Sequence, residues 1–179
     1  GATKMKQLRL SGTGGQGLIL GGIILAEAAL LDGKYAIQAQ SYGPEARGGS
    51  SKSETLISDN VIHYPKVTTP DVVLAMSQEA CNKYTVDLTD NGILITDSLF
   101  VSQLPANFKG QVYELPITHT AKDELGKTLV ANIVALGALV KITGVVSPES
   151  LKKAVLARVP KGTEALNEKA LDLGMALVK

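Results

Sequence analysis

The stretch Gly12-Thr13-Gly14-Gly15-Gln16-Gly17 decides the fold, because it separates a strand-like run from a long apolar helix. The run is Gln7 to Ser11. The helix is predicted over Leu18 to Leu31, where apolar residues face nearly all directions and Asp32-Gly33 ends the segment. An alternating second strand follows from Tyr35 to Gln40. This order of strand, glycine turn, helix and strand predicts a βαβ unit within a doubly wound α/β fold.

The glycines suit two different uses of the turn. They allow a tight bend, and they let an anion approach the first N–H groups of the helix. A dinucleotide site also needs an acidic residue at the end of the second strand, but this strand ends in Gln38-Ala39-Gln40-Ser41. No Gly-Lys-Ser/Thr follows the glycines, so a P-loop is excluded. An anion site and a turn packed against another part of the protein both stay open.

A second feature is the loop Ser41-Tyr42-Gly43-Pro44-Glu45-Ala46-Arg47-Gly48-Gly49-Ser50. Because it follows the second strand, we expect it at the carboxyl edge of the sheet, beside the glycine turn. Its aromatic, acidic and basic side chains suit recognition better than catalysis. Arg47 is the side chain that would bind a phosphate or a carboxylate. The alternative is that Arg47 bonds to Glu45 or to the backbone and only holds the loop.

The rest of the chain predicts a mostly parallel sheet with a hairpin insertion and a helical C-terminal third. Ser51–Ser58 alternates, is predicted to be half exposed, and is expected to form the hairpin with Val61–Tyr64 across Asp59-Asn60. Further strands are expected over Asp71–Met76, Gly92–Thr96 and Val112–Leu115, and helices over Gln78–Tyr84, Thr128–Thr143, from Pro148 with Ser147 as N-cap, and over Thr163–Val178. We interpret residues 5–179 as a single Rossmann-like domain, and residues 1–4 as a cloning remnant before a natural start at Met5.

The composition excludes several classes of protein. The residues are 45% hydrophobic and 20% charged, an ordinary globular profile, and the net charge of +1 gives no field to collect nucleic acid. The apolar runs Gly17–Leu31 and Val130–Val146 are too short or too charged to span a bilayer. With no signal peptide at the start, these features predict a cytoplasmic protein that contacts neither nucleic acid nor a membrane.

Residues for redox, metal or hydrolytic chemistry are scarce. An iron–sulfur cluster needs about four thiolates, whereas the chain has the single cysteine Cys81 and two histidines, His63 and His119. We expect Cys81 to be a half-buried residue at the start of a helix, His63 a hairpin surface residue and His119 a loop residue. No G-x-S-x-G or H-E-x-x-H motif occurs. We therefore nominate no catalytic and no metal-binding residue.

Together these stretches resemble a known family. The G-x-G-G-Q-G turn, the helix with Leu25-Ala26-Glu27-Ala28-Ala29 and the Y-G-P-E-A-R-G-G loop are similar to the gamma subunit of 2-oxoacid:ferredoxin oxidoreductases. So are the later stretches Pro70–Met76, Asp97-Ser98 and Asn132–Gly137. The sequence of this loop is most similar to that of the 2-oxoglutarate branch of the family.

The resemblance implies a multi-subunit enzyme that converts a 2-oxoacid and coenzyme A to an acyl-CoA and CO2 while reducing ferredoxin. It implies alpha and beta partner subunits, with a delta subunit left open, and thiamine diphosphate, Mg2+ and [4Fe-4S] clusters on those partners. This chain would bind no cofactor alone, and coenzyme A would enter as a substrate. The residues that the resemblance would place against coenzyme A or a partner subunit are Gly12, Gly14, Gly15, Gln16, Gly17, Tyr42 and Arg47.

Two other hypotheses stay open. A stand-alone module would bind a nucleotide with the Gly12–Gly17 turn, although the missing acidic residue argues against it. A purely structural scaffold would use the turn and the Arg47 loop as an interface and would bind no small molecule. Affinity of the isolated chain for a nucleotide would support the stand-alone module, whereas recovery of the chain with partner subunits would support a subunit of a complex.

Overall fold

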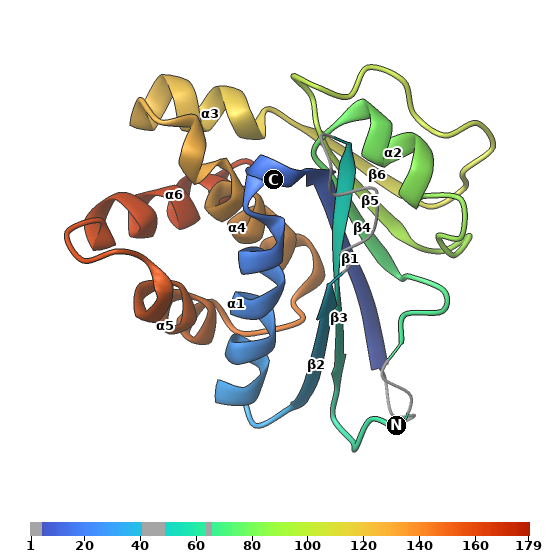
Figure 1. Ribbon diagram of the computed structural model, residues 1–179, viewed down its shortest axis with the longest axis horizontal. Helices are drawn as coiled ribbons and strands as arrows, with labels where there is room; N and C mark the ends of the chain where they lie inside the picture. The colour runs from blue at the N-terminus through green and yellow to red at the C-terminus, as the bar shows by residue number, and fades with distance from the viewer. Residues whose placement is uncertain (1–4, 41–48, 64–65) are drawn as a thin grey trace.

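The computed structural model describes residues 5–40, 49–63 and 66–179, which form a six-stranded sheet with helices on both faces (Figure 1). The sheet has the order β2-β3-β1-β4-β5-β6. Its strands are β1 (Met5–Thr13), β2 (Tyr35–Gln40), β3 (Ser50–Ser58), β4 (Val72–Ala75), β5 (Ile93–Asp97) and β6 (Gln111–Leu115). β1, β4, β5 and β6 run parallel, and β3 is antiparallel to both of its neighbours.

Most of the helices lie on one face of the sheet, whereas α2 lies on the other (Figure 1). The helices are α1 (Leu18–Leu31), α2 (Gln78–Tyr84), α3 (Ile117–Leu125), α4 (Ala131–Thr143), α5 (Pro148–Arg158) and α6 (Glu164–Ala176). The larger hydrophobic core lies between the sheet and α1, α4 and their neighbours, and a smaller one lies under α2. The doubly wound α/β fold is confirmed, and no helix in the described ranges is long and apolar enough to cross a membrane.

Three predicted elements have the predicted bounds: α1, β2 and α2. Ser147 is the N-cap of α5, since its side chain accepts a hydrogen bond from the backbone N–H of Ser150. The order strand, helix, strand of the βαβ unit is also confirmed. However, β3 lies between β1 and β2, so these two strands point the same way without pairing.

The predicted hairpin partner of β3 is wrong. Ser51–Ser58 was expected to pair with Val61–Tyr64, but β3 pairs with β1 on one side and β2 on the other, and residues 61–63 form no strand. β3 is buried rather than half exposed, because Ser53 and Thr55 face α1 while Glu54 binds the buried Arg9 on the other face of the sheet. Thr55 donates from Oγ1 to the carbonyl of Gly22, and a Cβ at Gly22 would lie 2.0 Å from the hydroxyl of Ser53.

Two helical predictions also need correction. His119 was expected to lie in a loop, but residues 117–125 form α3, so the exposed His119 lies on a helix. The long C-terminal helix was expected from Thr128, but residues 128–130 form a 3-10 turn, η3 (Thr128–Val130), and α4 begins at Ala131. Cys81 lies in the middle of α2 and is fully buried rather than half buried.

Candidate functional site

The candidate site lies at the carboxyl edge of the parallel strands. β1, β4, β5 and β6 end there, and the turns that follow them meet above the sheet, at the top of Figure 1. In doubly wound proteins this edge is where ligands bind, because loops from neighbouring strands converge on it. The glycine turn follows β1 at this edge, as the sequence predicts.

The glycine turn is built as a short 3-10 helix followed by a left-handed residue. Gly14–Gln16 form the 3-10 helix η1, and Gly17 has a φ of 71°, which a residue without a Cβ adopts readily. α1 begins directly afterwards at Leu18. The sharp change of direction between β1 and α1 therefore depends on a glycine at position 17.

Gln16 joins the ends of two strands. Its Oε1 accepts a hydrogen bond of 2.7 Å from the backbone N–H of Thr13, at the end of β1. Its Nε2 donates at 3.1 Å to the carbonyl of Met76, just after β4. The side chain thus satisfies two backbone groups where the strands end, and it fixes how β1 and β4 open toward the site.

The space beside Gly12 and Gly17 is filled by the protein itself. A Cβ at Gly12 would lie 2.1 Å from the Gln16 Oε1 atom and 2.6 Å from a methyl group of Leu18. A Cβ at Gly17 would lie 2.7 Å from the Nδ2 atom of Asn132, which donates at 3.1 Å to the Gly17 carbonyl. Both glycines are therefore required by close packing against Gln16 and Asn132.

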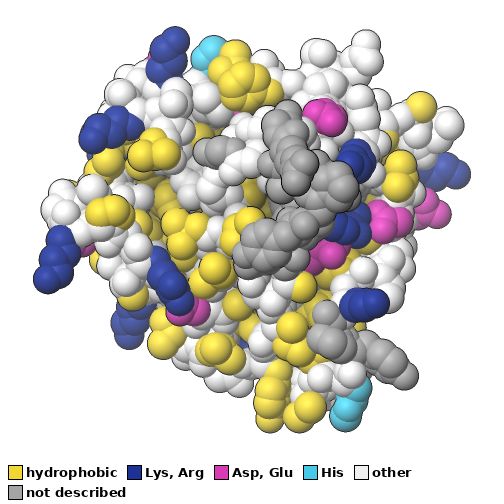
Figure 2. Space-filling view, viewed as in Figure 1, with side chains coloured by type: hydrophobic (Ala, Val, Ile, Leu, Met, Phe, Trp, Pro, Cys, Tyr) yellow, Lys and Arg dark blue, Asp and Glu magenta, His cyan; other side chains and the backbone are white. Residues whose placement is uncertain are grey.

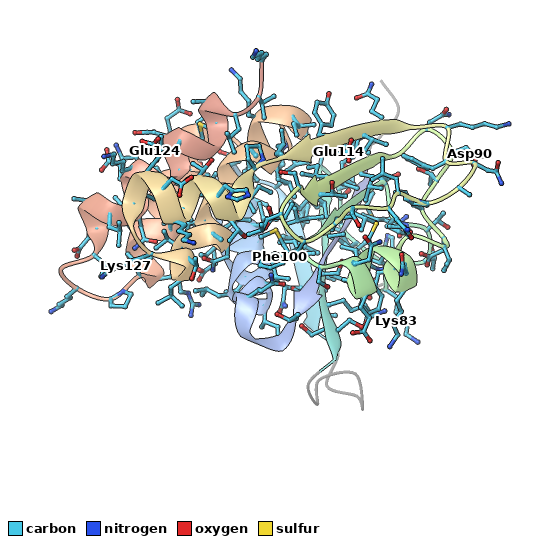
Figure 3. All side chains as sticks on the ribbon, turned by 90° about the horizontal axis from the view of Figure 1, so that it is seen from above. Lys83, Asp90, Phe100, Glu114, Glu124 and Lys127 are labelled. Carbon is cyan, nitrogen blue, oxygen red and sulfur yellow. The ribbon has the colours of Figure 1, made fainter. Side chains whose placement is uncertain are left out.

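A hollow of about 410 Å3 opens beside the turn. Thr13, Gln16, Phe100, Thr118, Thr128, Leu129 and Ala131 line it. Phe100 lies near the centre of this edge between the helical layer with Lys127 and helix α2 with Lys83 (Figure 3). Phe100 is 47% exposed and Leu129 is 80% exposed. Hydroxyl groups and two uncovered apolar side chains thus share one concave surface, which suits a ligand or a partner with both polar and apolar parts.

A second hollow, of about 280 Å3, lies on the other side of Leu129. Its apolar walls come from α1, α4 and α6 and from the segment before α6, including Leu20, Ile133 and Leu166. Gln16 and Leu129 line both hollows. The exposed Leu129 therefore forms a ridge between a mixed hollow and an apolar one.

Asp97 fixes the far wall of the site. It ends β5, is fully buried, and its carboxylate accepts hydrogen bonds from the backbone N–H groups of Leu99 and Thr118, each at 3.3 Å. It also accepts a hydrogen bond from the hydroxyl of Thr118. Asp97 thereby holds the turn with Phe100 against the start of α3. It is a positioning residue.

Arg9 of β1 is at the centre of a group of ion pairs next to the site. Its buried guanidinium binds Glu54 of β3 at 2.8 Å, Asp87 at 2.6 Å and the carbonyl of Tyr84 at 3.0 Å. Burial alone would lower the pKa of Arg9, but hydrogen bonds to Asp87 and Glu54 outweigh it and raise the pKa above its ordinary value. Arg9 stays charged and ties α2 to the sheet.

The predicted site residues fall into two groups. Gly12, Gly14, Gly15, Gln16 and Gly17 lie together at the carboxyl edge. Tyr42 and Arg47 lie outside the described residues, as does Glu45. A contact of these residues with coenzyme A or with a partner stays a prediction.

Other residues at this edge could be found only in part from the sequence. Asp97 follows a buried strand and points to the carboxyl edge on that ground alone. Asn132, Phe100 and Leu129 give no such signal, because their place depends on how α4 and the turn after β5 pack.

Among the described residues, no three His, Cys, Asp or Glu side chains gather as metal ligands. Burial raises the pKa of the Cys81 thiol, so it is a poor thiolate at neutral pH.

The fold and this edge define a class of protein. It is a doubly wound α/β chain in which Gln16 and Asn132 pack against the glycine turn and a hollow of mixed polarity lies beside it. Residues 7–177 match the family described as pyruvate ferredoxin/flavodoxin oxidoreductase. The chain belongs to this family, and the resemblance noted in the sequence is confirmed.

Individual relatives agree along nearly the full chain. The 2-oxoglutarate synthase subunit KorC of Methanocaldococcus jannaschii is 49% identical over 97% of this chain and 94% of its own. The gamma subunit of a keto/oxoacid ferredoxin oxidoreductase from Geobacter sulfurreducens is 51% identical, with a TM-score of 0.90 over 97% of this chain and 96% of that one.

A third similarity is to a larger chain. The 2-oxoglutarate:ferredoxin oxidoreductase of Magnetococcus marinus, solved with 2-oxoglutarate, coenzyme A and succinyl-CoA bound, is 26% identical with a TM-score of 0.85. The match covers 97% of this chain but only 31% of that one. The same fold therefore occurs both as a separate subunit and as one part of a longer polypeptide.

Proposed function

We propose that this chain is the gamma-type subunit of a 2-oxoglutarate:ferredoxin oxidoreductase. Such an enzyme converts 2-oxoglutarate and coenzyme A to succinyl-CoA and CO2, and the two electrons released reduce ferredoxin. The observation that carries the proposal is a gradient of identity. The KorC proteins of four archaea are between 38% and 49% identical to the chain. By contrast, a pyruvate synthase subunit PorC is 35% identical and a ketoisovalerate oxidoreductase subunit VorA is 32% identical.

The chain acts without redox chemistry of its own. Its one cysteine is buried and its thiol pKa is raised, and an iron–sulfur cluster needs about four thiolates. The clusters, thiamine diphosphate and Mg2+ therefore belong to alpha, beta and further partner subunits in this proposal. In this proposal the chain contributes an assembly interface and the coenzyme A side of the active site.

The carboxyl edge is the surface that we assign to the active-site side of the complex. Its mixed hollow carries hydroxyl groups from Thr13, Thr118 and Thr128 beside the apolar Phe100 and Leu129. A coenzyme A molecule or a partner loop has the same mixture of polar and apolar groups. In this assignment Gln16 and the glycine turn shape the wall, and Tyr42 and Arg47 supply the recognition groups.

The test is to purify the complex through a tag on this chain and to identify the proteins that come with it. The complex is then assayed for coenzyme A-dependent viologen reduction with 2-oxoglutarate, pyruvate and 2-oxoisovalerate. We expect a thiamine diphosphate-binding subunit, a cysteine-rich subunit, and activity at least about tenfold higher with 2-oxoglutarate. A chain recovered alone, with affinity for a nucleotide, would support the stand-alone module instead.

A further inference from the structure

Helix α1 has an apolar face that the described residues 5–40, 49–63 and 66–179 leave uncovered. The helix packs on the sheet, on α5 and on α4, but the stripe that faces away from the sheet is half-buried or exposed. The stripe follows helical spacing and consists of Ile19, Ile23, Ala26 and Leu30, with Leu20 and Leu31 beside it. Leu30 is 58% exposed and Leu31 56% exposed. A helix that is apolar on all sides is typical of a fully buried position.

The charge on this face is already neutralised. Glu27 binds Arg158, the last residue of α5, through two hydrogen bonds of 2.8 Å that match the carboxylate to the guanidinium fork. The hydrogen bond from Arg158 lowers the pKa of Glu27, and burial only partly offsets it. The carboxylate is therefore paired before anything covers the helix, which is what a covered charge requires.

The strand beside α1 is the last one of the described sheet. β2 pairs with β3 on one side, and in the described sheet its other side has no neighbouring strand. The sequence Tyr-Ala-Ile-Gln-Ala-Gln of this strand carries no charge. Proteins that leave an edge in water place charges, proline or bulges on it to prevent pairing with other chains. Figure 2 shows hydrophobic side chains along the course that α1 takes in the same view of Figure 1.

We propose that the outward stripe of α1 and the start of the neighbouring strand β2 form one docking surface for a large partner subunit. We call it the α1/β2 surface, with residues 19, 20, 23, 26, 30 and 31 of α1 and residues 35–37 of β2. This inference rests on the proposed function and adds to it the face by which the chain is held. The surface meets the apolar hollow at Leu20 and runs from there along α1, and none of its residues lines the mixed hollow beside the glycine turn.

The occupant follows from the longer relatives. In the Magnetococcus marinus protein the matching part is 31% of the chain, and in VorA of Methanothermobacter thermautotrophicus it is 35% of the protein. In these relatives the same domain is covalently joined to a further polypeptide of about twice its size. The counterpart of that polypeptide is the partner that we place on the α1/β2 surface. A permanent interface of this kind is more apolar than ordinary protein surface, as this one is.

The test compares charged substitutions on this surface with a matched one elsewhere. Ile23→Arg combined with Leu30→Arg is made in the tagged chain within the whole complex. The control is Val112→Arg on β6, at the opposite edge of the sheet, where Val112 is 37% exposed. We expect at least about a tenfold loss of the copurifying large subunit for the double variant and unchanged recovery for the control. Circular dichroism and the thermal midpoint of each isolated chain check that both fold.

Each outcome has a separate meaning. If the unmodified chain brings no large subunit with it, the proposed function fails. If it does, and the double variant recovers as much of that subunit as the control, the α1/β2 surface is not the docking site. If the unmodified chain is a dimer by light scattering, and the double variant becomes a monomer that still assembles, the surface binds a second copy and the proposal is overturned.

Discussion

The sheet ends differently at its two edges. β6 is short, exposes the charged Glu114 and the polar Gln111, and lies beside parallel strands. β2 is uncharged, pairs antiparallel with β3, and lies under a helix whose outer stripe is apolar. Both are edge strands in the described chain, yet only β6 carries a charge of the kind that keeps an edge in water. The difference is one reason why we place the partner subunit at the β2 end.

The largest effect is expected at the residue that ties the two ends together. Arg9 on β1 binds Glu54 in the antiparallel part and Asp87 after α2 in the parallel part. Arg9→Met keeps the length of the side chain but removes the cation that the two carboxylates share, and it leaves Glu54 only its longer contact of 3.5 Å with Lys52. We expect a loss of about 3 kcal/mol in the free energy of unfolding, at the low end for a broken buried pair because Asp87 is partly exposed.

Urea unfolding of the isolated chain measures this loss. Arg9→Lys is the matched variant, because it keeps the charge but loses the guanidinium fork. Its free energy of unfolding should lie between those of the unmodified chain and of Arg9→Met. If Arg9→Met were as stable as the unmodified chain, Arg9 would not be what holds the two parts of the sheet together.

A smaller effect is expected at Asp32, which fixes α5 and hence Arg158 relative to α1. Its carboxylate accepts hydrogen bonds of 2.7 Å from the backbone N–H and the hydroxyl of Ser147, and another from the hydroxyl of Ser150. Burial alone would raise the pKa of Asp32, but the bonds from Ser150 and Ser147 outweigh it, so the pKa lies below its usual value. We expect Asp32→Asn to cost about 1 kcal/mol at pH 7.

The pH dependence gives this prediction its sign. Because the pKa is lower in the folded protein, the stabilisation is present above the ordinary pKa of an Asp, about 3.9, and is lost as the pH falls through the lower folded value. Thermal midpoints measured from pH 7 down to about pH 3 should therefore converge for the two proteins. Asp90→Asn, at an exposed turn residue, is the control. A constant difference at all pH values would contradict the role of the carboxylate charge.

Local sequence explains the first part of the fold well. α1 begins after Gly17 and stops before Asp32-Gly33, and these residues are visible without any structure. α3 was missed because its first residues, Ile117 and Thr118, are β-branched and no capping residue precedes them. The αL residue Gly126, which ends α3, was the one signal for it.

Long-range contacts explain what local sequence did not predict. The position of β3 between β1 and β2 depends on buried hydroxyl groups facing Gly22, which alternation alone presents as an exposed polar face. In the site, the glycine turn was predicted, but the bond from Gln16 to Met76 joins residues 60 positions apart. Likewise Asn132 and Gly17, which are joined by a hydrogen bond, lie 115 positions apart. Such pairings are set by the packing of whole elements and have no local signal.

Substitution of Glu27 is expected to have the smallest effect on the stability of the isolated chain. It is also the most direct test of whether the β2 end of the sheet is covered in the complex. Glu27 and Arg158 are 37% and 45% exposed, and water screens a pair of this kind so strongly that Glu27→Gln should leave the thermal midpoint unchanged. Under a partner subunit the same substitution leaves the charge of Arg158 unpaired in a dry interface. The dissociation rate of the complex should then rise about tenfold or more.

A second surface pair provides the control for this substitution. Lys152 and Glu168 join α5 to α6 at 2.6 Å and are 49% and 42% exposed, so their exposure closely matches that of Glu27 and Arg158. Glu168→Gln removes the same kind of charge from a place outside the α1/β2 surface, and it should change neither the midpoint nor the dissociation rate. Equal dissociation rates for both variants would mean that α1 stays in water in the complex. The uncharged β2 edge would then need another explanation.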